Sequence, residues 1–461
     1  MYGKNHRIHF IGIGGSGMSG IAEVLLNMGY PVTGSDLKPS EVTARLIERG
    51  GRVVVGHSAS NVEGAQVVVV STAVRKDNPE VVAAAQSGIP IISRAEMLAE
   101  LMRMKYGIAV GGSHGKTTTT SMIATVIARG GLDPTIVVGG RLHALGTNAR
   151  LGHGQFLVAE ADESDGSFLR LAPAVSVITN VDREHLDYYA GIEQIRQAFA
   201  YFANRVPFYG VTVLCADDVN VRAILPKVQK RTRLYGTVPE AAVRAESIEL
   251  DARGSRFAVT AGGAGLGTIE LRVPGRHNVL NALAAVTVGL ELEVGFGHVA
   301  EALHGFAGVG RRFETRGEAN GVRVVDDYGH HPTEVLATLA AARGMGGRVL
   351  VLFQPHRYTR TAALAEEFGG SFRDADRVWV LDIYPAGEAP IEGVTARRLV
   401  DCAHAQSQRQ VQYAPDAHAA AEAAALEARP GDTVLTLGAG DVGKLGDEVL
   451  GHLRSAVGGR R

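Results

Sequence analysis

Cysteine is scarce in this chain, with only Cys215 and Cys402 among 461 residues. Two cysteines cannot form a disulfide framework, and their positions match no metal-ligand spacing. The sequence therefore predicts a protein of a reducing cytoplasm.

The chain also lacks an excess of charge of either sign. It has 47 Lys plus Arg against 48 Asp plus Glu, a formal net charge of -1. Such a balance gives no general attraction to nucleic acid or to an anionic membrane. We expect no nucleic-acid partner and predict that ligands are recognised locally.

Long hydrophobic runs are absent as well, since no stretch approaches the roughly 18 apolar residues of a membrane span. The first apolar run, "IHFIGIGGSGMSGIA", is broken by glycine and does not resemble the core of a signal peptide. We therefore expect neither export nor membrane insertion. Hydrophobic residues make up 46% and charged residues 21%, as in ordinary globular domains.

Short β-branched runs alternate with alanine- and leucine-rich stretches of helical length. This rhythm predicts an α/β fold with buried parallel sheets, and it restarts twice along the chain. Residues 240–275 instead alternate strands with glycine turns, which predicts a small antiparallel excursion. At about 100 to 200 residues per domain, the length favours three domains. We predict domains at 1–106, 107–310 and 311–461.

The first glycine-rich loop, "IGIGGSGMSG", matches G-x-G-x-x-G through Gly12, Gly14 and Gly17. Asp36 ends the next predicted strand about 20 positions on, where a dinucleotide fold would hold a ribose. The pattern alone suggests NAD. Its physical content is broader, because glycines and a helix N-terminus suit any nucleotide diphosphate.

The second loop, "GGSHGKTTTT", follows an apolar strand. Lys116 could reach terminal phosphates and Thr117 could bind Mg²⁺. The spacing departs from a Walker A motif, because Val110 stands where that motif has its first glycine. A glycine turn with a solvated lysine is the alternative.

Carboxylates downstream favour a nucleotide site. "QFLVAEADESD" ends a predicted strand at Glu160, our candidate for a cation ligand, because strand ends of a parallel sheet face one crevice. Asp162, Glu163 and Asp165 are equally compatible with a solvated acidic turn. A further predicted strand ends in "VITNVDREHLDYY", which contributes His185, although a lone histidine is more often structural.

With these motifs assembled, the chain resembles the Mur ligase family, the ATP-dependent amide ligases of peptidoglycan precursor synthesis. Their short phosphate loop reads G-[ST]-x-G-K-T, as in "GSHGKT". The blocks "VAEADESDGSFL", "PGRHNVLNALAA", "VDDYGHHPTEV" and "LFQPHRYTRT" extend the likeness over nearly the whole chain. The resemblance implies an N-terminal Rossmann-like domain for a UDP-sugar, a central P-loop ATPase domain, and a C-terminal Rossmann-like domain that closes over both.

The resemblance implies the following site. Lys116, Glu160 and His185 would be catalytic, and Thr117, Glu160 and His185 would hold Mg²⁺, with two ions expected. The residues expected to contact ATP are Gly112, Ser113, His114, Gly115, Lys116, Thr117, Thr118, Asn278, Asn281, Arg312 and Asp327. Those expected to contact UDP-N-acetylmuramate and the amino acid are Gly15, Ser16, Gly17, Met18, Asp36, Ser71, His330, Arg357 and Arg360.

Some of these residues have simpler interpretations. Without the resemblance, Asn278 and Asn281 would be read as a helix cap or an exposed helix face. The pair His330 and His331 could suggest a transition metal, but no third soft ligand lies nearby in the sequence. The glycine cluster "LGAGDVGK" is interpreted as a structural turn.

One absence separates branches of the family. Several relatives bind the second metal through a carbamylated lysine, but Ala200 occupies that position and no lysine occurs between Lys116 and Lys227. This favours the branch that adds L-alanine over those that add glutamate or diaminopimelate. A recycling branch that adds a tripeptide, an NAD-dependent oxidoreductase and a nucleotide-binding regulator remain alternatives. The sequence leaves open whether the protein is a monomer or a homodimer.

Overall fold

The computed structural model describes residues 6–71, 73–142, 147–252 and 254–458; for residues 16, 139–142, 147–148 and 456–458 it describes the backbone alone. The chain forms two compact units. The first comprises Met1–Val181, Arg196–Val243 and Leu283–Ala302, and the second comprises Asp182–Ile195, Arg244–Ala282 and Leu303–Arg461.

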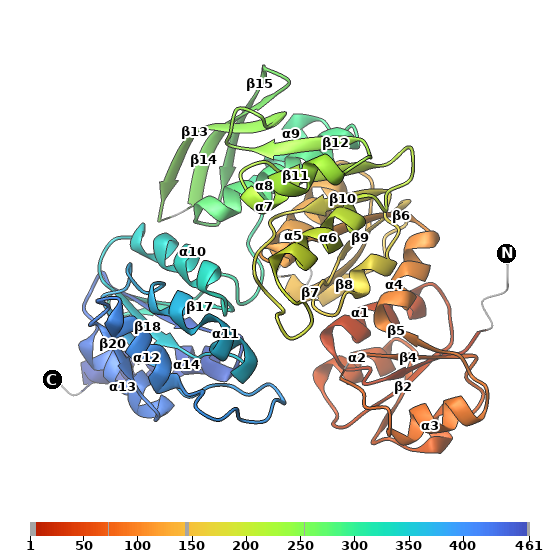
Figure 1. Cartoon of the computed structure of the whole chain (residues 1–461), viewed down its shortest axis with the longest axis horizontal. Coiled ribbons are helices and arrows are strands. Elements are labelled where there is room, and N and C mark those ends of the chain that lie inside the picture. Colours follow the sequence, from red (N-terminus) through yellow and green to blue (C-terminus); the bar gives the residue numbers. More distant parts are fainter. Residues whose placement is uncertain (1–5, 72, 143–146, 253, 459–461) are drawn as a thin grey trace. The chain divides into compact units, whose positions relative to one another are not determined.

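The first unit contains a five-stranded parallel sheet with the order β3-β2-β1-β4-β5. Its central strand, β1 (Ile8–Ile11), is buried along its whole length, as expected where helices cover both faces of a parallel sheet. The other strands are β2 (Val32–Asp36), β3 (Arg52–Val55), β4 (Val67–Val70) and β5 (Ile91–Ser93). The helices are α1 (Ser16–Asn27), α2 (Glu41–Glu48), α3 (Pro79–Gln86), α4 (Arg94–Arg103) and the short η1 (Ala59–Val62), and they alternate with the strands (Figure 1).

The first unit also contains strands in the order β12-β11-β10-β6-β9-β7-β8. All neighbours are parallel except β7 and β8. The strands are β6 (Tyr106–Gly111), β7 (Thr135–Leu142), β8 (Thr147–Arg150), β9 (Phe156–Glu160), β10 (Val175–Ile178), β11 (Val211–Cys215) and β12 (Thr232–Gly236). The accompanying helices are α5 (Lys116–Arg129), η2 (Ser167–Arg170), α6 (Ile192–Ala203), α7 (Val219–Ile224), η3 (Leu225–Lys227), α8 (Arg276–Glu291) and α9 (Phe296–His304). The first turns of α6 and α8 and the end of α9 belong to the second unit.

The antiparallel excursion is present in the second unit. It consists of β13 (Val243–Asp251), β14 (Gly254–Ala261) and β15 (Ala264–Leu271), and β14 and β15 form an antiparallel hairpin. Gly262 and Gly263, both with positive φ, make its turn, as glycine does in tight hairpins.

The remaining sheet of the second unit has the order β16-β17-β21-β18-β19-β20, with only β16 antiparallel to its neighbour. Alternate residues of its central strands enter two hydrophobic clusters, one on each face. The strands are β16 (Glu314–Ala319), β17 (Val322–Asp327), β18 (Val349–Phe353), β19 (Arg377–Val380), β20 (Val411–Tyr413) and β21 (Thr433–Leu437). The helices are α10 (Pro332–Arg343), α11 (Tyr358–Gly369), α12 (Ala396–Ala405), α13 (Ala417–Glu427), η4 (Asp441–Lys444) and α14 (Leu445–Gly458).

The predicted fold class is confirmed: mostly parallel sheets are accompanied by helices, and one small region is antiparallel. Among the helices that the structure describes, none has the length and apolar character needed to cross a membrane.

Candidate active site

The candidate residues fall in both compact units. The first unit holds Gly15, Ser16, Gly17, Met18, Asp36, Ser71, Gly112, Ser113, His114, Gly115, Lys116, Thr117, Thr118 and Glu160. The second holds His185, Asn278, Asn281, Arg312, Asp327, His330, Arg357 and Arg360.

The second glycine-rich loop joins β6 to α5, as its sequence predicts. Gly112 has φ 132°, and Gly115, the N-cap of α5, has φ 78°. The end of β10 braces the loop, because the backbone N–H of His114 donates to Asn180 Oδ1 at 2.8 Å and Thr179 Oγ1 donates to the His114 carbonyl at 2.7 Å. No side chain caps α5. The N–H groups at such a helix start point out of the helix without a side-chain acceptor, which is the arrangement that binds anions.

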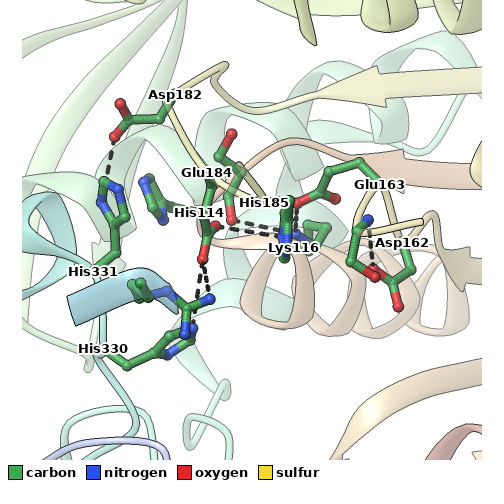
Figure 2. Close-up of polar contacts among 12 residues, drawn as sticks. His114, Lys116, Asp162, Glu163, Asp182, Glu184, His185, His330 and His331 are labelled. Carbon is green, nitrogen blue, oxygen red and sulfur yellow. Dashed lines mark hydrogen bonds and ion pairs between the residues drawn. The ribbon is translucent and has the colours of Figure 1, made fainter. Parts of the chain in front are cut away.

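Lys116 lies at the first position of α5. Its Nζ donates to the carbonyls of Gly112 (2.7 Å) and Ser113 (3.2 Å) and to Glu163 Oε1 (2.8 Å). Figure 2 shows the lysine beside this carboxylate. Glu163 is only 1% exposed, so it does not belong to a solvated acidic turn. The sequence offered no signal to separate it from its acidic neighbours, because burial depends on how the turn folds back.

Glu160 is the last residue of β9 and lies in register with Val110 of β6. The carboxylate therefore lies beside the end of β6, the strand that leads into the phosphate loop. Thr117 and Thr118 are buried in the first turn of α5. Hydroxyl and carboxylate oxygens are the donors that Mg²⁺ prefers, so the residue types at this edge fit a hard cation.

Asp162 links the acidic turn to α4. Its carboxylate is 3.0 Å from Arg94 Nη2 and accepts from the Ser164 N–H at 3.1 Å. Burial raises its pKa, but the charges of Lys116 and Arg94 and the Ser164 bond outweigh it and lower the pKa to about 2. Arg94 also packs on Gly17, where a Cβ would lie 2.3 Å from Nη1. Arg94 therefore touches both the first glycine-rich loop and the acidic turn.

The first glycine-rich loop is braced by Asp36. The Gly14 N–H donates to Asp36 Oδ2 at 2.8 Å, and a Cβ at Gly14 would lie equally close to that oxygen. The helix that follows begins after Gly15, again without a side-chain cap. In this structure Asp36 thus holds loop backbone, a role that the dinucleotide pattern does not predict.

The remaining candidates of this loop region are placed as follows. Met18 is 2% exposed in α1. Ser71 directly follows β4 and is half-buried. The side chain of Ser16 lies outside the described residues.

In the second unit, His185 lies in a turn and has φ 53°. Its carbonyl accepts from the N–H groups of Tyr188 and Tyr189, both at 2.9 Å. The imidazole Nε2 lies 3.7 Å from Glu184 Oε2.

Arg360 and His330 both contact Glu184, and Figure 2 shows His330 beside this carboxylate. Arg360 Nη2 donates to Glu184 Oε1 at 2.9 Å, and His330 Nε2 is 3.6 Å from the same oxygen. Arg360 Nη1 also lies 3.2 Å from His356 Nδ1, which accepts from it. Burial, followed by the charges of His330, Arg360, Arg357 and Arg311, lowers the pKa of His356 to about 3. His356 is therefore neutral at physiological pH, and neither it nor Glu184 was among the predicted site residues.

Arg357 lies at the start of α11 with φ 71°, and its N–H donates to the Tyr384 carbonyl at 2.8 Å. Its Nη1 is 3.8 Å from Asp187 and 3.9 Å from Glu388. A pocket of about 360 Å³ opens beside Arg357 and Arg360. Its wall includes residues 183–187 and the first turns of α11, and its polar and small side chains suit a zwitterionic amino acid.

Asn278 and Asn281 are buried in the first turns of α8. Asn278 Nδ2 donates to the Pro274 carbonyl at 2.7 Å, and Asn281 Nδ2 donates to Asn278 Oδ1 at 3.1 Å. The pair is not an exposed helix face.

Arg312 stacks on Tyr328, 5.1 Å from the ring centre. Asp327 accepts from the N–H groups of Phe313 (2.7 Å) and Gly329 (2.8 Å) and from the Thr338 hydroxyl (3.1 Å). Burial raises its pKa. Asp327 therefore orders the loops on either side of β17.

Two alternative motifs have structural explanations. His331 Nδ1 accepts from the Thr333 N–H at 3.3 Å and caps α10. In "LGAGDVGK", the carbonyls of Gly438 and Gly440 accept from Arg311 at 2.8 and 3.2 Å. These bonds from Arg311, which lies outside the motif, hold the glycine turn and support its structural interpretation.

Comparisons with known proteins cover nearly the whole length of the chain. Three family models match consecutive segments: "Mur ligase family, catalytic domain" at 7–106, "Mur ligase middle domain" at 110–289 and "Mur ligase, glutamate ligase domain" at 311–440. A UDP-N-acetylmuramate–L-alanine ligase of a Geobacter species is 57% identical, with 99% of each chain covered. The enzyme of the same name from Solibacter usitatus is 55% identical over 99% of this chain and 97% of its own.

Solved structures agree with these relatives. The UDP-N-acetylmuramate-alanine ligase of Thermotoga maritima has a TM-score of 0.81 at 29% identity, covering 98% of this chain and 99% of its own. A murein peptide ligase from Psychrobacter arcticus, at 23% identity and a TM-score of 0.71 over 98% of this chain and 99% of its own, shares the fold. The short phosphate loop and the full-length matches together establish that the chain belongs to the Mur ligase family.

Proposed function

We propose that the protein is an ATP-dependent amide ligase that joins L-alanine to the lactyl carboxylate of UDP-N-acetylmuramate, with release of ADP and phosphate. The observation that carries this proposal is the uncapped start of α5, where Lys116 is held beside buried Glu163 in a short G-S-H-G-K-T loop. The alanine ligases that are 55–57% identical to this chain support the choice of substrates.

The chemistry requires activation of a carboxylate. A lactyl carboxylate oxygen attacks the γ-phosphorus of ATP, ADP leaves, and an acyl phosphate forms. The neutral amine of alanine then attacks the acyl carbon, phosphate leaves with the C–O electron pair, and the amine loses a proton. Catalysis of this kind rests on positioning and charge neutralisation.

Within this scheme, Lys116 and the N-terminus of α5 would neutralise the transferring phosphoryl group. The loop residues Gly112, Ser113, His114, Gly115 and Thr118 would surround the phosphates. Thr117 and Glu160 would hold Mg²⁺, and His185 would hold a second ion. Bound Mg²⁺ supplies charge neutralisation at the phosphate oxygens.

The substrates would be divided among the other candidates. Gly15–Met18, Asp36 and Ser71 would hold the UDP-sugar. Asn278, Asn281, Arg312 and Asp327 would contact the nucleotide of ATP. His330, Arg357 and Arg360 would take the carboxylates of alanine or of the sugar, because guanidinium is a planar bidentate donor.

The test is phosphate release in the presence of ATP, Mg²⁺, UDP-N-acetylmuramate and L-alanine, with each omitted in turn. We expect release only in the complete mixture. Replacing alanine by the murein tripeptide distinguishes the recycling reaction, and turnover of the tripeptide but not of alanine would contradict the proposal.

Lys116→Ala should lower the rate roughly 100-fold or more, because a cation aimed at the transition state is lost. Lys105→Ala is a matched control. Lys105 also donates to two backbone carbonyls, those of Gly152 and Gly154, but it precedes β6 rather than following it. Full activity of the Lys116 variant, or equal losses in both variants, would refute the assigned role.

A further inference from the structure

Glu80 is a buried carboxylate with no part in the proposed chemistry. It lies in the first turn of α3 and is 0% exposed. A buried carboxylate is costly unless hydrogen bonds replace its hydration. The hydrogen-bond donors to Glu80 therefore show which segments of the chain its carboxylate holds together.

One oxygen of Glu80 faces the strands. Ser35 Oγ donates to Oε2 at 2.6 Å, and His9 Nε2 donates to it at 3.3 Å. The other oxygen faces the segment after β3. Asn61 Nδ2 donates to Oε1 at 2.5 Å and the Ser58 N–H donates at 3.3 Å.

His57 completes the cluster. Its Nδ1 is 3.0 Å from Ser35 Oγ and 3.5 Å from Glu80 Oε1. Because the Ser35 proton points to Glu80, His57 donates to Ser35. Burial raises the pKa of Glu80, but bonds from His9, Ser35 and Asn61 outweigh it and lower the pKa to about 2. The carboxylate is therefore charged at physiological pH.

These contacts converge on the carboxyl edge of the first sheet. Ser35 directly precedes Asp36, whose carboxylate braces Gly14 and whose carbonyl accepts from the Gly56 N–H at 2.8 Å. Residues 56–61 form the segment after β3. Glu80 therefore ties together two neighbouring strand ends beside the proposed diphosphate loop.

The order of the strands also bears on how the sugar nucleotide would lie. The carboxylate to be activated must reach the phosphate loop of α5. Arg94, which follows β5, lies on that side of the sheet, because it contacts both Gly17 and Asp162. In the order β3-β2-β1-β4-β5, the β2 and β3 ends lie on the other side of the diphosphate loop. The nucleoside end of the ligand belongs there.

Resting on the proposed function, we propose that Glu80 is a positioning residue for the nucleoside end of UDP-N-acetylmuramate: it fixes Ser35 and His57, and with them the strand ends that receive that end of the ligand. It touches neither ATP nor the reacting atoms. Its loss should weaken sugar-nucleotide binding selectively.

The test compares Glu80→Gln with wild type by steady-state phosphate release and by calorimetry with UDP alone. The amide keeps the side chain's size but removes the charge and one acceptor. We expect the KM for UDP-N-acetylmuramate and the Kd for UDP to rise about tenfold, while kcat and the KM for ATP stay within about twofold. This pattern is expected when the lost interaction binds the substrate equally well in the ground state and in the transition state.

Glu23→Gln is the matched control. Glu23 is a buried glutamate of α1 that pairs with Arg45 and Arg49 of the neighbouring segment, at 3.3 and 3.2 Å. Its loss should lower stability and leave the KM for the sugar nucleotide unchanged. If Glu80→Gln does not fold, Ser35→Ala, which removes the 2.6 Å donor, should show the same selective change.

An unchanged KM in folded Glu80→Gln, parallel losses for both substrates, or equal effects of the Glu80 and Glu23 variants would each overturn the inference and leave a purely structural role. A wild-type protein that releases no phosphate would instead count against the proposed function. UDP calorimetry would still report on Glu80 in that case.

Discussion

At the scale of single residues, the phosphate loop depends on backbone that only glycine tolerates. Gly112 has φ 132°, and a Cβ there would lie 2.0 Å from Thr179 Oγ1. Gly131 also has positive φ, 80°, but nothing lies within 4 Å of its added Cβ. An alanine at Gly131 would therefore add backbone strain alone, whereas an alanine at Gly112 would add both backbone strain and a steric clash.

We predict that Gly112→Ala lowers the free energy of unfolding by more than about 2 kcal/mol, because a clash is added to left-handed strain. Gly131→Ala should cost only about 1 kcal/mol from strain alone. Urea denaturation measures both. Equal costs would show that the loop relaxes away from Thr179.

The loop motif by itself predicts roles for Lys116 and Gly115, because the pattern specifies these residue types at these positions. The sequence does not single out Glu163, because four acidic residues in one short segment have the same local pattern and only the folded turn buries one of them against Lys116. Glu184 beside Arg360 is a similar case, since its partner is distant in sequence.

At the scale of elements, helix starts divide into two kinds. Helices α2, α3, α4, α7, α10, α12 and α13 begin after a residue whose side chain accepts from the helix backbone. Helix α11 begins after Arg357 without such a bond. Helices α1 and α5 begin after glycines, which supply no such bond either. These are the two helices proposed to receive phosphates, which can occupy the position of a cap.

A helix start with a side-chain cap can be tested at α13. Asp416 accepts from the N–H groups of His418 and Ala419, both at 3.0 Å. Asp416→Ala should lower the free energy of unfolding by about 1 kcal/mol without changing kcat, because two helix donors lose their acceptor. Asp401→Ala within α12 should change it by less than about 0.5 kcal/mol. An effect of the Asp416 variant on KM would contradict a purely structural cap.

Strands with buried β-branched runs were predictable, whereas polar edge strands were not. β16, "ETRGEA", and β8, "TNAR", have no apolar pattern. Each is antiparallel to its neighbour and is a strand only because that neighbour offers hydrogen bonds.

At the scale of the whole molecule, ligands that bind the folded chain should raise its melting temperature by mass action. We predict that UDP-N-acetylmuramate at about 100 times its Kd raises the Tm by about 5 °C. NADH should have no effect, because the first glycine-rich loop lies in a Mur ligase domain and is proposed to hold the UDP-sugar. A shift with NADH and none with the sugar nucleotide, in differential scanning fluorimetry, would favour the oxidoreductase interpretation.

The sequence by itself determined the order of strands and helices, both glycine-rich loops and the residue types of a phosphate site, because these depend on periodicity and on local backbone demands. Tertiary structure alone decided which carboxylate meets Lys116, that Asp36 braces Gly14, and that Glu80 joins Ser35 to Asn61. Those contacts connect residues far apart in the chain, and their energies depend on burial and dielectric surroundings that no local pattern encodes.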